Sequence, residues 1–324
     1  MCSAVVVLSS LTEAQESRPT SGSGARMYEW VSGWGDFQKE SIGNTHGGVV
    51  VANDGKIYFN TDGEQAIRWT TTDGKESGSI GKDLHGGLHG MALVKEGKED
   101  ALLLAHTHRH EVVRMKLDGT IVWTIPWPKE SGKYKSADEY RPTSVAEAPD
   151  GSVFVSDGYG KSLIHKFDKS RKWVSCFGRD GKPGEALQTP HGLLMDIRDG
   201  VATLLTCDRE NHRLVRFDLD GKVVATYSEG LRRPCNVVKD GDAYLVADLA
   251  GRVTVIDAKT FAPIAQLFDN PDPKLRAENG VARTQWKAGA FISPHGIGVA
   301  SNGDVYVNEW LSTGRIVKLR RIKS

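Results

Sequence analysis

Apolar and polar residues alternate along the chain in short runs that come in pairs. In each pair an apolar run is followed by a Gly-containing turn, most often Asp-Gly or Asn-Gly, and then by a second β-rich run. This pattern is typical of a β-hairpin, because Gly and Asn tolerate the positive φ of tight turns. Six such segments recur, at 44–59, 87–104, 141–155, 190–205, 233–246 and 294–307. The pattern therefore predicts an all-β protein built from repeated hairpins.

The six segments share one register. When they are aligned, one position stands at the start of the first apolar run of every segment, and we call the residue there the anchor of its repeat. The anchors are His46, His89, Thr143, His191, Cys235 and His295. Successive anchors lie 43 to 60 residues apart, a spacing that suits a four-stranded propeller blade. Six anchors therefore predict six blades, and we expect Trp123, Trp127 and Trp173 to pack between blades.

The N-terminal part of the chain offers a strand that could close the ring. Closure by a strand from the other terminus leaves no sheet edge unpaired. Residues 29–35 (EWVSGWG) resemble the outer strand expected at 172–178 (KWVSCFG). We therefore predict a six-bladed β-propeller of four-stranded blades, a single domain over 26–324 that is closed by an N-terminal strand. Residues 1–25 are predicted to be a disordered tail or the remnant of a signal peptide.

The overall charge narrows the choice of partners. The 42 basic and 41 acidic residues leave a net charge of +1, which favours neither nucleic acid nor an anionic membrane. No apolar run approaches the ~20 residues of a transmembrane helix. The four cysteines lack the spacing of a zinc finger.

We expect a monomer that is periplasmic or secreted if the N-terminus is a truncated signal peptide, and cytoplasmic otherwise.

The histidine anchors carry the first candidate chemistry. In an antiparallel hairpin the start of the first strand and the end of the second lie at the same end, so the anchors should ring one mouth of the central channel. His89, His191 and His295 belong to alternate blades and can converge on the axis. Three neutral imidazoles with an open fourth position are typical of a catalytic zinc site. The alternative is that histidine is only a local structural preference of this repeat.

Other polar residues are expected at the same mouth. His46 could be a fourth ligand, a group behind the ligands or a contact to substrate. His106 and His108 follow the second strand of blade two and could bind a metal or simply line the cleft. Glu309 and Trp310 end the second strand of blade six, where Trp310 could stack against a ligand. Arg141 precedes the blade-three anchor, as an anion contact or a surface salt bridge.

Several of these motifs resemble a known family. The stretches "RPTSVAEAPDGSVFVSDGY", "TPHGL" with "CDREN", and "SPHGIGVASNGDVYV" resemble NHL-repeat six-bladed propellers. Within that group they are most similar to the peptidyl-α-hydroxyglycine α-amidating lyase domain. The resemblance implies zinc on His89, His191 and His295, with the base of "SDGY" on Tyr159 and the arginine of "DREN" on Arg209. The implied reaction breaks a C–N bond to give an amide and glyoxylate.

The chain departs from that family at three positions. Thr61 or Asp62 stands where the family has a second arginine, and an acidic residue there would repel a substrate carboxylate. Gly296 replaces the aspartate of the family's structural calcium site, which puts that calcium in doubt. Gly160 replaces a cysteine, so the corresponding disulfide is lost. The metal chemistry could thus be kept while the substrate differs.

Three functions remain open from the sequence. The first is a lyase that uses Zn²⁺, or another divalent transition metal, to cleave a C–N or C–O bond. The second is a metal-dependent hydrolase or lactonase acting on a carbohydrate-derived substrate. The third is a binding propeller without catalysis. In each case the ligand is expected to be a small molecule, derived from a peptide or a sugar, and histidine donors favour zinc over calcium.

Overall fold

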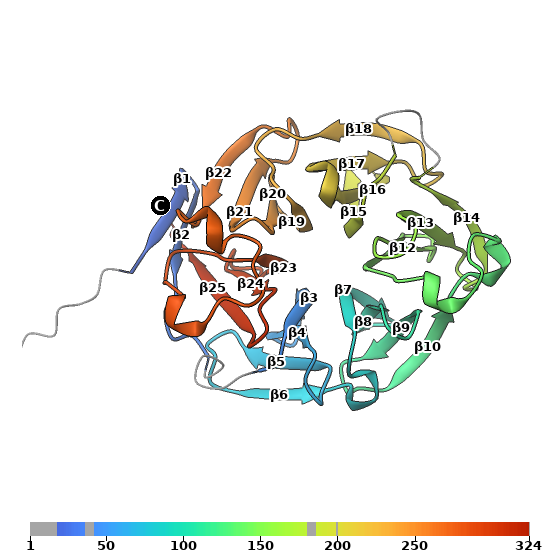
Figure 1. Cartoon of the computed structure of the whole chain (residues 1–324), viewed down its shortest axis with the longest axis horizontal. Helices are drawn as coiled ribbons and strands as arrows, with labels where there is room; N and C mark the ends of the chain where they lie inside the picture. Colours follow the sequence, from blue (N-terminus) through green and yellow to red (C-terminus); the bar gives the residue numbers. More distant parts are fainter. Residues whose placement is uncertain (1–17, 36–41, 180–185, 199, 324) are drawn as a thin grey trace, which may run out of the picture.

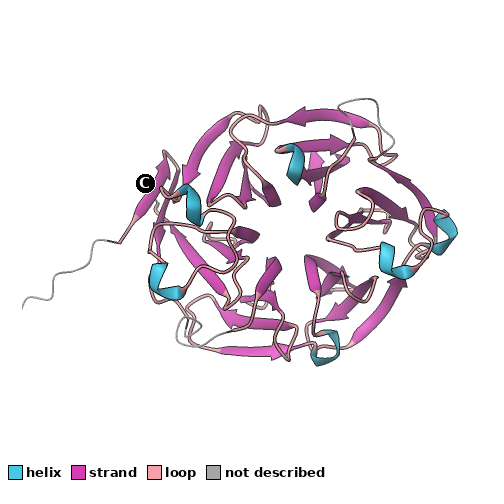
Figure 2. Ribbon diagram, in the orientation of Figure 1, coloured by secondary structure: helices cyan, strands magenta, loops and turns pink. Residues whose placement is uncertain are grey.

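The computed structural model of the protein describes residues 18–35, 42–179, 186–198 and 200–323. Over these residues the chain forms six antiparallel sheets that surround a central channel like the blades of a propeller (Figures 1 and 2). The predicted all-β fold with six blades of four strands is confirmed, and blade six carries β1 as an additional outer strand. The only helices in the described part of the chain are short 3₁₀ turns, and none is long and apolar enough to cross a membrane.

Each of the first three blades runs outward from the channel in chain order. Blade one contains β3 (Thr45–Val51), β4 (Lys56–Thr61), β5 (Ile67–Thr71) and β6 (Ser77–Ile80). Blade two contains β7 (Leu88–Glu96), β8 (Glu99–His106), β9 (Glu111–Lys116) and β10 (Ile121–Pro126). Blade three contains β11 (Ser144–Glu147), β12 (Val153–Asp157), β13 (Leu163–Phe167) and β14 (Trp173–Phe177). Hairpin connections alone explain this order, because antiparallel neighbours need only a short turn.

Blades four and five repeat this arrangement, and blade six takes strands from both ends of the chain. Blade four contains β15 (Pro190–Arg198), β16 (Val201–Asp208), β17 (Arg213–Phe217) and β18 (Val223–Tyr227). Blade five contains β19 (Pro234–Asp240), β20 (Ala243–Asp248), β21 (Arg252–Asp257) and β22 (Pro263–Leu267). Blade six contains β23 (Pro294–Val299), β24 (Val305–Glu309), β25 (Arg315–Arg321), β2 (Arg26–Trp30) and β1 (Thr20–Ser23). The 3₁₀ turns are η2 (Lys82–Leu84), η3 (Lys129–Ser131), η4 (Ala137–Glu139), η5 (Arg209–Asn211), η6 (Pro273–Leu275) and η7 (Arg283–Gln285).

The ring is closed by an N-terminal strand, as predicted. β2 pairs antiparallel with β25, with Tyr28 opposite Arg321 and Trp30 opposite Leu319, so the blue and red ends of the chain lie side by side (Figure 1). The sheet of blade six includes residues before the expected boundary at Arg26, because β1 forms a hairpin with β2. The sequence of β1, TSGS, has no apolar pattern and is held by backbone pairing, which the pattern could not reveal. Residues 1–17 of the predicted tail lie outside the described residues.

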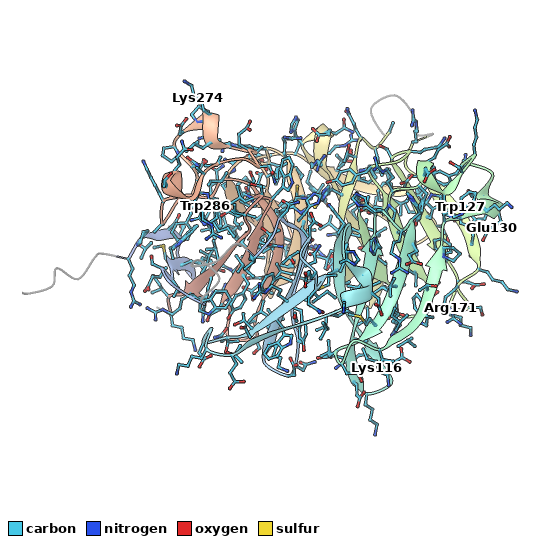
Figure 3. The ribbon with its side chains drawn as sticks, turned by 60° about the horizontal axis from the view of Figure 1, so that its bottom comes forward. Lys116, Trp127, Glu130, Arg171, Lys274 and Trp286 are labelled. Atoms are coloured by element: carbon cyan, nitrogen blue, oxygen red, sulfur yellow. The ribbon has the colours of Figure 1, made fainter. Side chains whose placement is uncertain are left out.

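The core is divided among the seams between blades. Each of the six seams holds an apolar cluster that is fed by both neighbouring sheets, because a sheet with two apolar faces must bury both. Trp123, Trp127 and Trp173 pack against the cluster between blades two and three, as expected. Lys274 and Lys116 project from opposite faces of the disc in the tilted view of Figure 3. The loop that carries Lys274 connects blades five and six on the face of the mouth.

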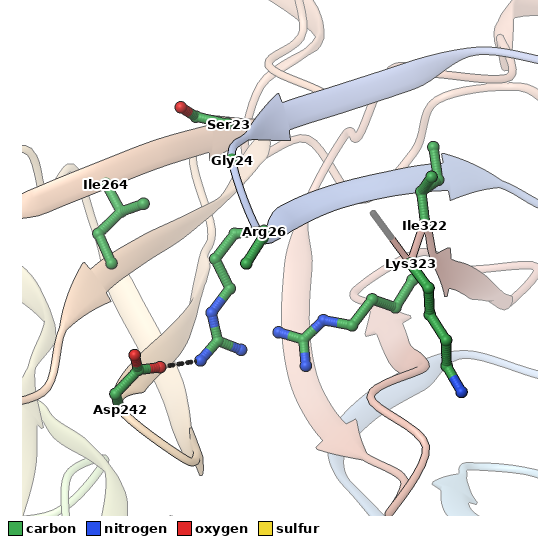
Figure 4. A pocket seen from close by; sticks show the side chains of 9 residues that line it. Ser23, Gly24, Arg26, Asp242, Ile264, Ile322 and Lys323 are labelled. Carbon is green, nitrogen blue, oxygen red and sulfur yellow. Dashed lines mark hydrogen bonds and ion pairs between the residues drawn. The ribbon is translucent and has the colours of Figure 1, made fainter.

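The closing seam has a second layer of contacts near the rim. Arg26 forms ion pairs with Asp240 and Asp242 of the β19–β20 turn, and Arg321 pairs with Asp240 at 2.8 Å. Arg26, Asp242 and Arg321 line an open pocket of about 520 Å³ (Figure 4). The pocket shares no residue with the cavity at the mouth of the channel, and the Arg26–Asp242 pair joins blades five and six at its edge. We therefore interpret it as part of the closure.

Candidate active site

Five of the six anchors, all but Thr143, sit at an irregularity in the pairing of the first and second strands of their blades. Pairing of β15 with β16 shifts between Pro190 and Leu193, and the same shift occurs in blades two, five and six. The extra residue of such a bulge is left out of the ladder and its side chain is re-aimed. In blade four that residue lies at His191–Gly192. The bulge therefore explains how a residue near the start of a strand comes to face the channel.

The glycine that follows the anchor lets the inner strands approach closely. A Cβ on Gly192 would lie 2.5 Å from the carbonyl oxygen of Cys235, and one on Gly296 would lie 1.9 Å from that of Gly47. No real side chain tolerates such contacts. An aspartate at position 296 would collide with the backbone of blade one. The missing calcium aspartate therefore has a structural reason.

Hydrogen bonds between neighbouring blades orient two of the histidines. Nδ1 of His89 lies 2.6 Å from the carbonyl oxygen of Thr143, and Nδ1 of His191 lies 2.8 Å from that of Cys235. A carbonyl only accepts, so Nδ1 carries the proton and Nε2 keeps its lone pair. This is the arrangement that fixes the tautomer of metal-binding histidines.

The four anchor histidines, His46, His89, His191 and His295, form one cluster at the mouth. Centroids of neighbouring rings are 4.5–4.9 Å apart. Burial lowers the pKa of His46 to about 4 and holds those of the other three well below the usual value. The imidazoles are therefore neutral at pH 7 and available as donors. Two overlapping groups could hold a metal ion, namely His46, His89 and His295, and His191, Cys235 and His295.

Tyr159 lies above this cluster, in the turn that follows β12. Its hydroxyl oxygen is 3.2 Å from Nε2 of His89, 3.0 Å from Nε2 of His191 and 3.4 Å from Nε2 of His46. Nη1 of Arg209 donates to the same oxygen at 3.3 Å. The hydroxyl of Tyr159 is thus the point at which three anchor histidines and Arg209 meet.

Burial dominates the electrostatics of Tyr159. Burial raises the pKa of Tyr159 to about 12, and Arg209 acts in the opposite direction without overcoming it. The reason is that burial removes the phenolate from water, which disfavours the charged form. Without a further positive charge the phenol therefore stays protonated at neutral pH.

A cavity of about 310 Å³ opens above the cluster. It is lined by His46, Tyr159, Arg209, Arg233, Leu249, His295 and Trp310. Trp310 therefore lies at the mouth, with its ring centroid 6.0 Å from that of His46. Sequence reasoning missed Arg233 and Leu249. An Arg-Pro step precedes both the blade-five and the blade-three anchors, but Arg141 of blade three is exposed and outside the cavity, so the step alone does not place an arginine at the mouth.

Arg209 and Arg233 are coupled through one carboxylate. Oε1 of Glu210 accepts from Nε of Arg209 at 2.8 Å and from Nη2 of Arg233 at 2.6 Å. Two guanidinium groups therefore share one acidic partner at the wall of the cavity. This wall keeps a net positive charge, which favours a ligand that carries an anionic group.

A second set of polar residues ends the second strands of blades three to six. These strand-end acids are Asp157, Asp208, Asp248 and Glu309, all fully buried. Each accepts hydrogen bonds from backbone amides two or three residues before the anchor of its own blade, and none of them lines the mouth cavity. Glu309 also pairs with the buried Arg315 at 3.0 Å. The structure therefore does not bring Glu309 into the site.

Three further predicted residues are also outside the cavity. His106 is buried, with Nε2 against the carbonyl oxygen of Leu84 and Nδ1 accepting from the amide of Arg109. His108 is exposed, and its ring covers Gly87. The side chain of Arg141 is exposed, while its amide donates to Asp157. His106 and His108, at the end of β8 and in the turn after it, therefore contact neighbouring loop residues and do not line the mouth cavity.

Comparisons with known proteins bear on this site. No protein-family model matches the chain. The chain is 26% identical over 186 residues (56% of its length) to a probable peptidyl-α-hydroxyglycine α-amidating lyase of Caenorhabditis elegans. It is 29% identical over 176 residues (52% of its length) to peptidyl-α-hydroxyglycine α-amidating lyase 2 of Drosophila melanogaster. It spans 49% and 39% of these relatives' own lengths.

A structural comparison supports the fold only. A gluconolactonase from Xanthomonas campestris superposes with a TM-score of 0.63 over 94% of this chain and 95% of that chain, at 12% identity. The resemblance to amidating lyases is therefore confirmed at the level of sequence similarity and propeller fold. The assignment of the repeats as NHL repeats stays a prediction.

Proposed function

We propose that this protein is a metal-dependent lyase that cleaves a C–N or C–O bond at the mouth of its channel, in the manner of an amidating lyase. The observation that carries the proposal is the position of the Tyr159 hydroxyl. It lies within hydrogen-bonding distance of Nε2 of His89, Nε2 of His191 and Nη1 of Arg209. A phenol at such a junction is suited to proton transfer, because its hydroxyl can donate to Nε2 of a histidine while its oxygen accepts from Arg209, whose positive charge favours the phenolate.

The residues present fit a divalent transition metal such as zinc. His89, His191 and His295 would hold it, because neutral imidazoles are the donors that zinc takes in catalytic sites. Both ring nitrogens of His295 are buried and have no hydrogen-bond partner, which is costly for a polar side chain unless a ligand completes it. When bound, the cation would polarise a substrate oxygen and, by its charge, favour the phenolate of Tyr159.

The proton path follows from the chain's own residues. Tyr159 as phenolate accepts the proton of a substrate hydroxyl at its Oη, while Arg209 stabilises the negative charge. The C–N bond beside that hydroxyl breaks as a C=O bond forms, and the leaving nitrogen takes a proton that Tyr159 can return. An N-acyl-α-hydroxyglycine would thus give an amide and glyoxylate, with all atoms conserved.

The cavity supports a small anionic substrate. Its volume of about 310 Å³ is at the lower end of ordinary ligand sites. Arg209 and Arg233 line one wall and share Glu210, so a carboxylate can be paired there. Arg233 would supply the second arginine that the sequence lacks at Thr61 and Asp62. Trp310 offers an apolar face for the remainder of the ligand.

The test is glyoxylate release from an N-acyl-α-hydroxyglycine by the zinc-loaded protein. A lactone of a sugar acid is assayed in parallel for the alternative of a hydrolase. We expect glyoxylate and amide in equal amounts, loss of release after treatment with a chelator, and recovery with zinc. Hydrolysis of the lactone without glyoxylate release would favour the hydrolase. Inactivity on both substrates, with metal bound, would favour a binding propeller.

A further inference from the structure

The blade-five anchor is a cysteine in a ring of histidines. Cys235 occupies the bulge that holds His191 in blade four and His295 in blade six, and it is fully buried. Its Sγ and one ring nitrogen each of His191 and His295 all lie within 4.8 Å of one another. Three donor atoms so close can meet at one cation, because zinc–nitrogen and zinc–sulfur bonds are about 2.0 and 2.3 Å long.

A second observation points to a ligand at the same place. His295 is 2% exposed, and neither of its ring nitrogens has a hydrogen-bond partner. Nδ1 of His191, in contrast, is engaged by the carbonyl oxygen of Cys235 itself. The backbone of residue 235 thus orients one histidine, while its side chain lies beside two of them.

The inner end of the site has the size of a single ion. Below the mouth, Cys235 shares a narrow cavity of about 10 Å³ with His89, His191 and His295, which is room for about one water-sized sphere. Arg209 donates to the Tyr159 hydroxyl, and its positive charge favours the thiolate form of Cys235 against the effect of burial.

We propose that Cys235 is a thiolate ligand of the metal centre, together with His191 and His295, so that the site of this chain has mixed nitrogen and sulfur donors. The inference rests on the metal site of the proposed function: Cys235 takes the place of His89 among its three protein ligands, which leaves one position open for the substrate. Coordination replaces the S–H bond by a sulfur–metal bond and releases one proton to solvent. Nitrogen and sulfur donors select zinc, cobalt or cadmium over calcium or magnesium.

Cobalt substitution of the full chain tests the inference without reference to activity. Co²⁺ bound to a thiolate gives a charge-transfer band in the near ultraviolet, which histidine ligands alone do not give. Calorimetry in buffers of different ionisation enthalpy counts the protons released per metal. We expect the band for the unaltered protein and not for Cys235→Ser, and one more released proton for the unaltered protein than for this variant.

Cys207→Ser is the matched control. Cys207 is equally buried and is also a free thiol, but it belongs to neither group of potential ligands among the described residues. This variant should keep the band and the proton. Circular dichroism of both metal-free variants checks that the propeller is folded. If Cys235→Ser does not fold, the spectrum and proton count of the unaltered protein still decide.

The outcomes separate this inference from the proposed function. Stoichiometric metal without the band and without proton release would overturn the thiolate and leave the three-histidine site intact. The band persisting in Cys235→Ser would also overturn it. If the unaltered protein binds no transition metal, the proposed function and the thiolate ligand both fail.

Discussion

Two sets of polar side chains surround the mouth of the channel, the strand-end acids and the anchor histidines. They differ in the hydrogen-bond partners of their polar atoms. The carboxylate oxygens of the strand-end acids accept hydrogen bonds from the protein itself, as those of Asp208 do from the amide of Gln188 and from Arg213. The anchor histidines engage one ring nitrogen or none in this way. Nε2 of His191 instead faces the hydroxyl of Tyr159, and His295 has no partner at either nitrogen.

This difference distinguishes the side chains that have a structural role from those that are available to a ligand. Both sets repeat from blade to blade, so repetition alone does not reveal which one acts. The strand-end acids accept hydrogen bonds from the backbone just before each anchor and so fix the position of the anchor at the channel. The anchor histidines keep at least one ring nitrogen that no backbone group engages. Buried polar groups are normally satisfied, and an unsatisfied one therefore indicates where a ligand belongs.

The largest expected effect comes from replacing an anchor histidine, and it is compared with replacing His106, whose two ring nitrogens are engaged by the protein in the way of the strand-end acids. His191→Ala should abolish metal binding and turnover. His106→Ala should leave both intact and lower the free energy of unfolding by about 1–3 kcal/mol, because the Leu84 carbonyl and the Arg109 amide lose a buried partner. Metal analysis and urea denaturation of both variants measure this. Metal loss in His106→Ala but not in His191→Ala would reverse the comparison.

The second prediction tests whether the Tyr159 hydroxyl acts or only fills space. Tyr159→Phe keeps the ring and removes the group that contacts His89, His191 and Arg209. Turnover should fall roughly 10²–10⁴-fold, the usual contribution of a general base, while metal content stays unchanged. Tyr134→Phe is the control, because Tyr134 bonds to Asp157 and His165 instead. Full activity of Tyr159→Phe would remove the proposed mechanism.

The sequence predicted most of the fold, since the fold follows from repeated local patterns. Anchor spacing gave six blades, and the likeness of 29–35 to 172–178 pointed to the closing strand, which the structure places at Arg26–Trp30. β1 was missed because its four residues, TSGS, carry no hydrophobic alternation. Pairing by backbone alone leaves no trace in such a pattern.

The site was predictable only in part. Register and blade parity brought His89, His191 and His295 together, and the resemblance to a family supplied Tyr159 and Arg209. Glu309 and His106 were expected at the mouth because each ends a second strand. Which way such a side chain turns depends on the path of the incoming loop, and that path is a tertiary property. Arg233 was missed for the same reason, because its partner Glu210 comes from another blade.

The third prediction concerns stability rather than chemistry. Glu309→Ala leaves the guanidinium of Arg315 buried without its 3.0 Å partner, so the free energy of unfolding should fall by about 3–5 kcal/mol. Glu29→Ala is the control, because its partners Arg18 and Arg320 are exposed and such pairs contribute about 1 kcal/mol or less. Equal losses in both variants would show that burial of the pair does not matter.

The smallest effect is expected in the pH dependence of stability. Burial raises the pKa of Asp157 to about 6, although the amides of Arg141 and Lys161 and the hydroxyl of Tyr134 oppose this by donating to it. The folded chain then holds this proton to higher pH than the unfolded chain, whose aspartates titrate near 3.9. The contribution of Asp157 to stability therefore falls as pH rises from about 4 to 6.

Asp157→Asn removes this titration, so the stability difference between the unaltered protein and the variant should shrink between pH 4 and pH 7. Two pKa units correspond to roughly 2–3 kcal/mol, measured by urea denaturation at both pH values. Asp118→Asn is the opposite control, because a hydrogen bond from the Thr120 amide lowers the pKa of the exposed Asp118. Its stability difference should grow with pH. A difference for Asp157→Asn that is constant with pH would mean that this strand-end acid is charged throughout, and that its backbone donors outweigh its burial.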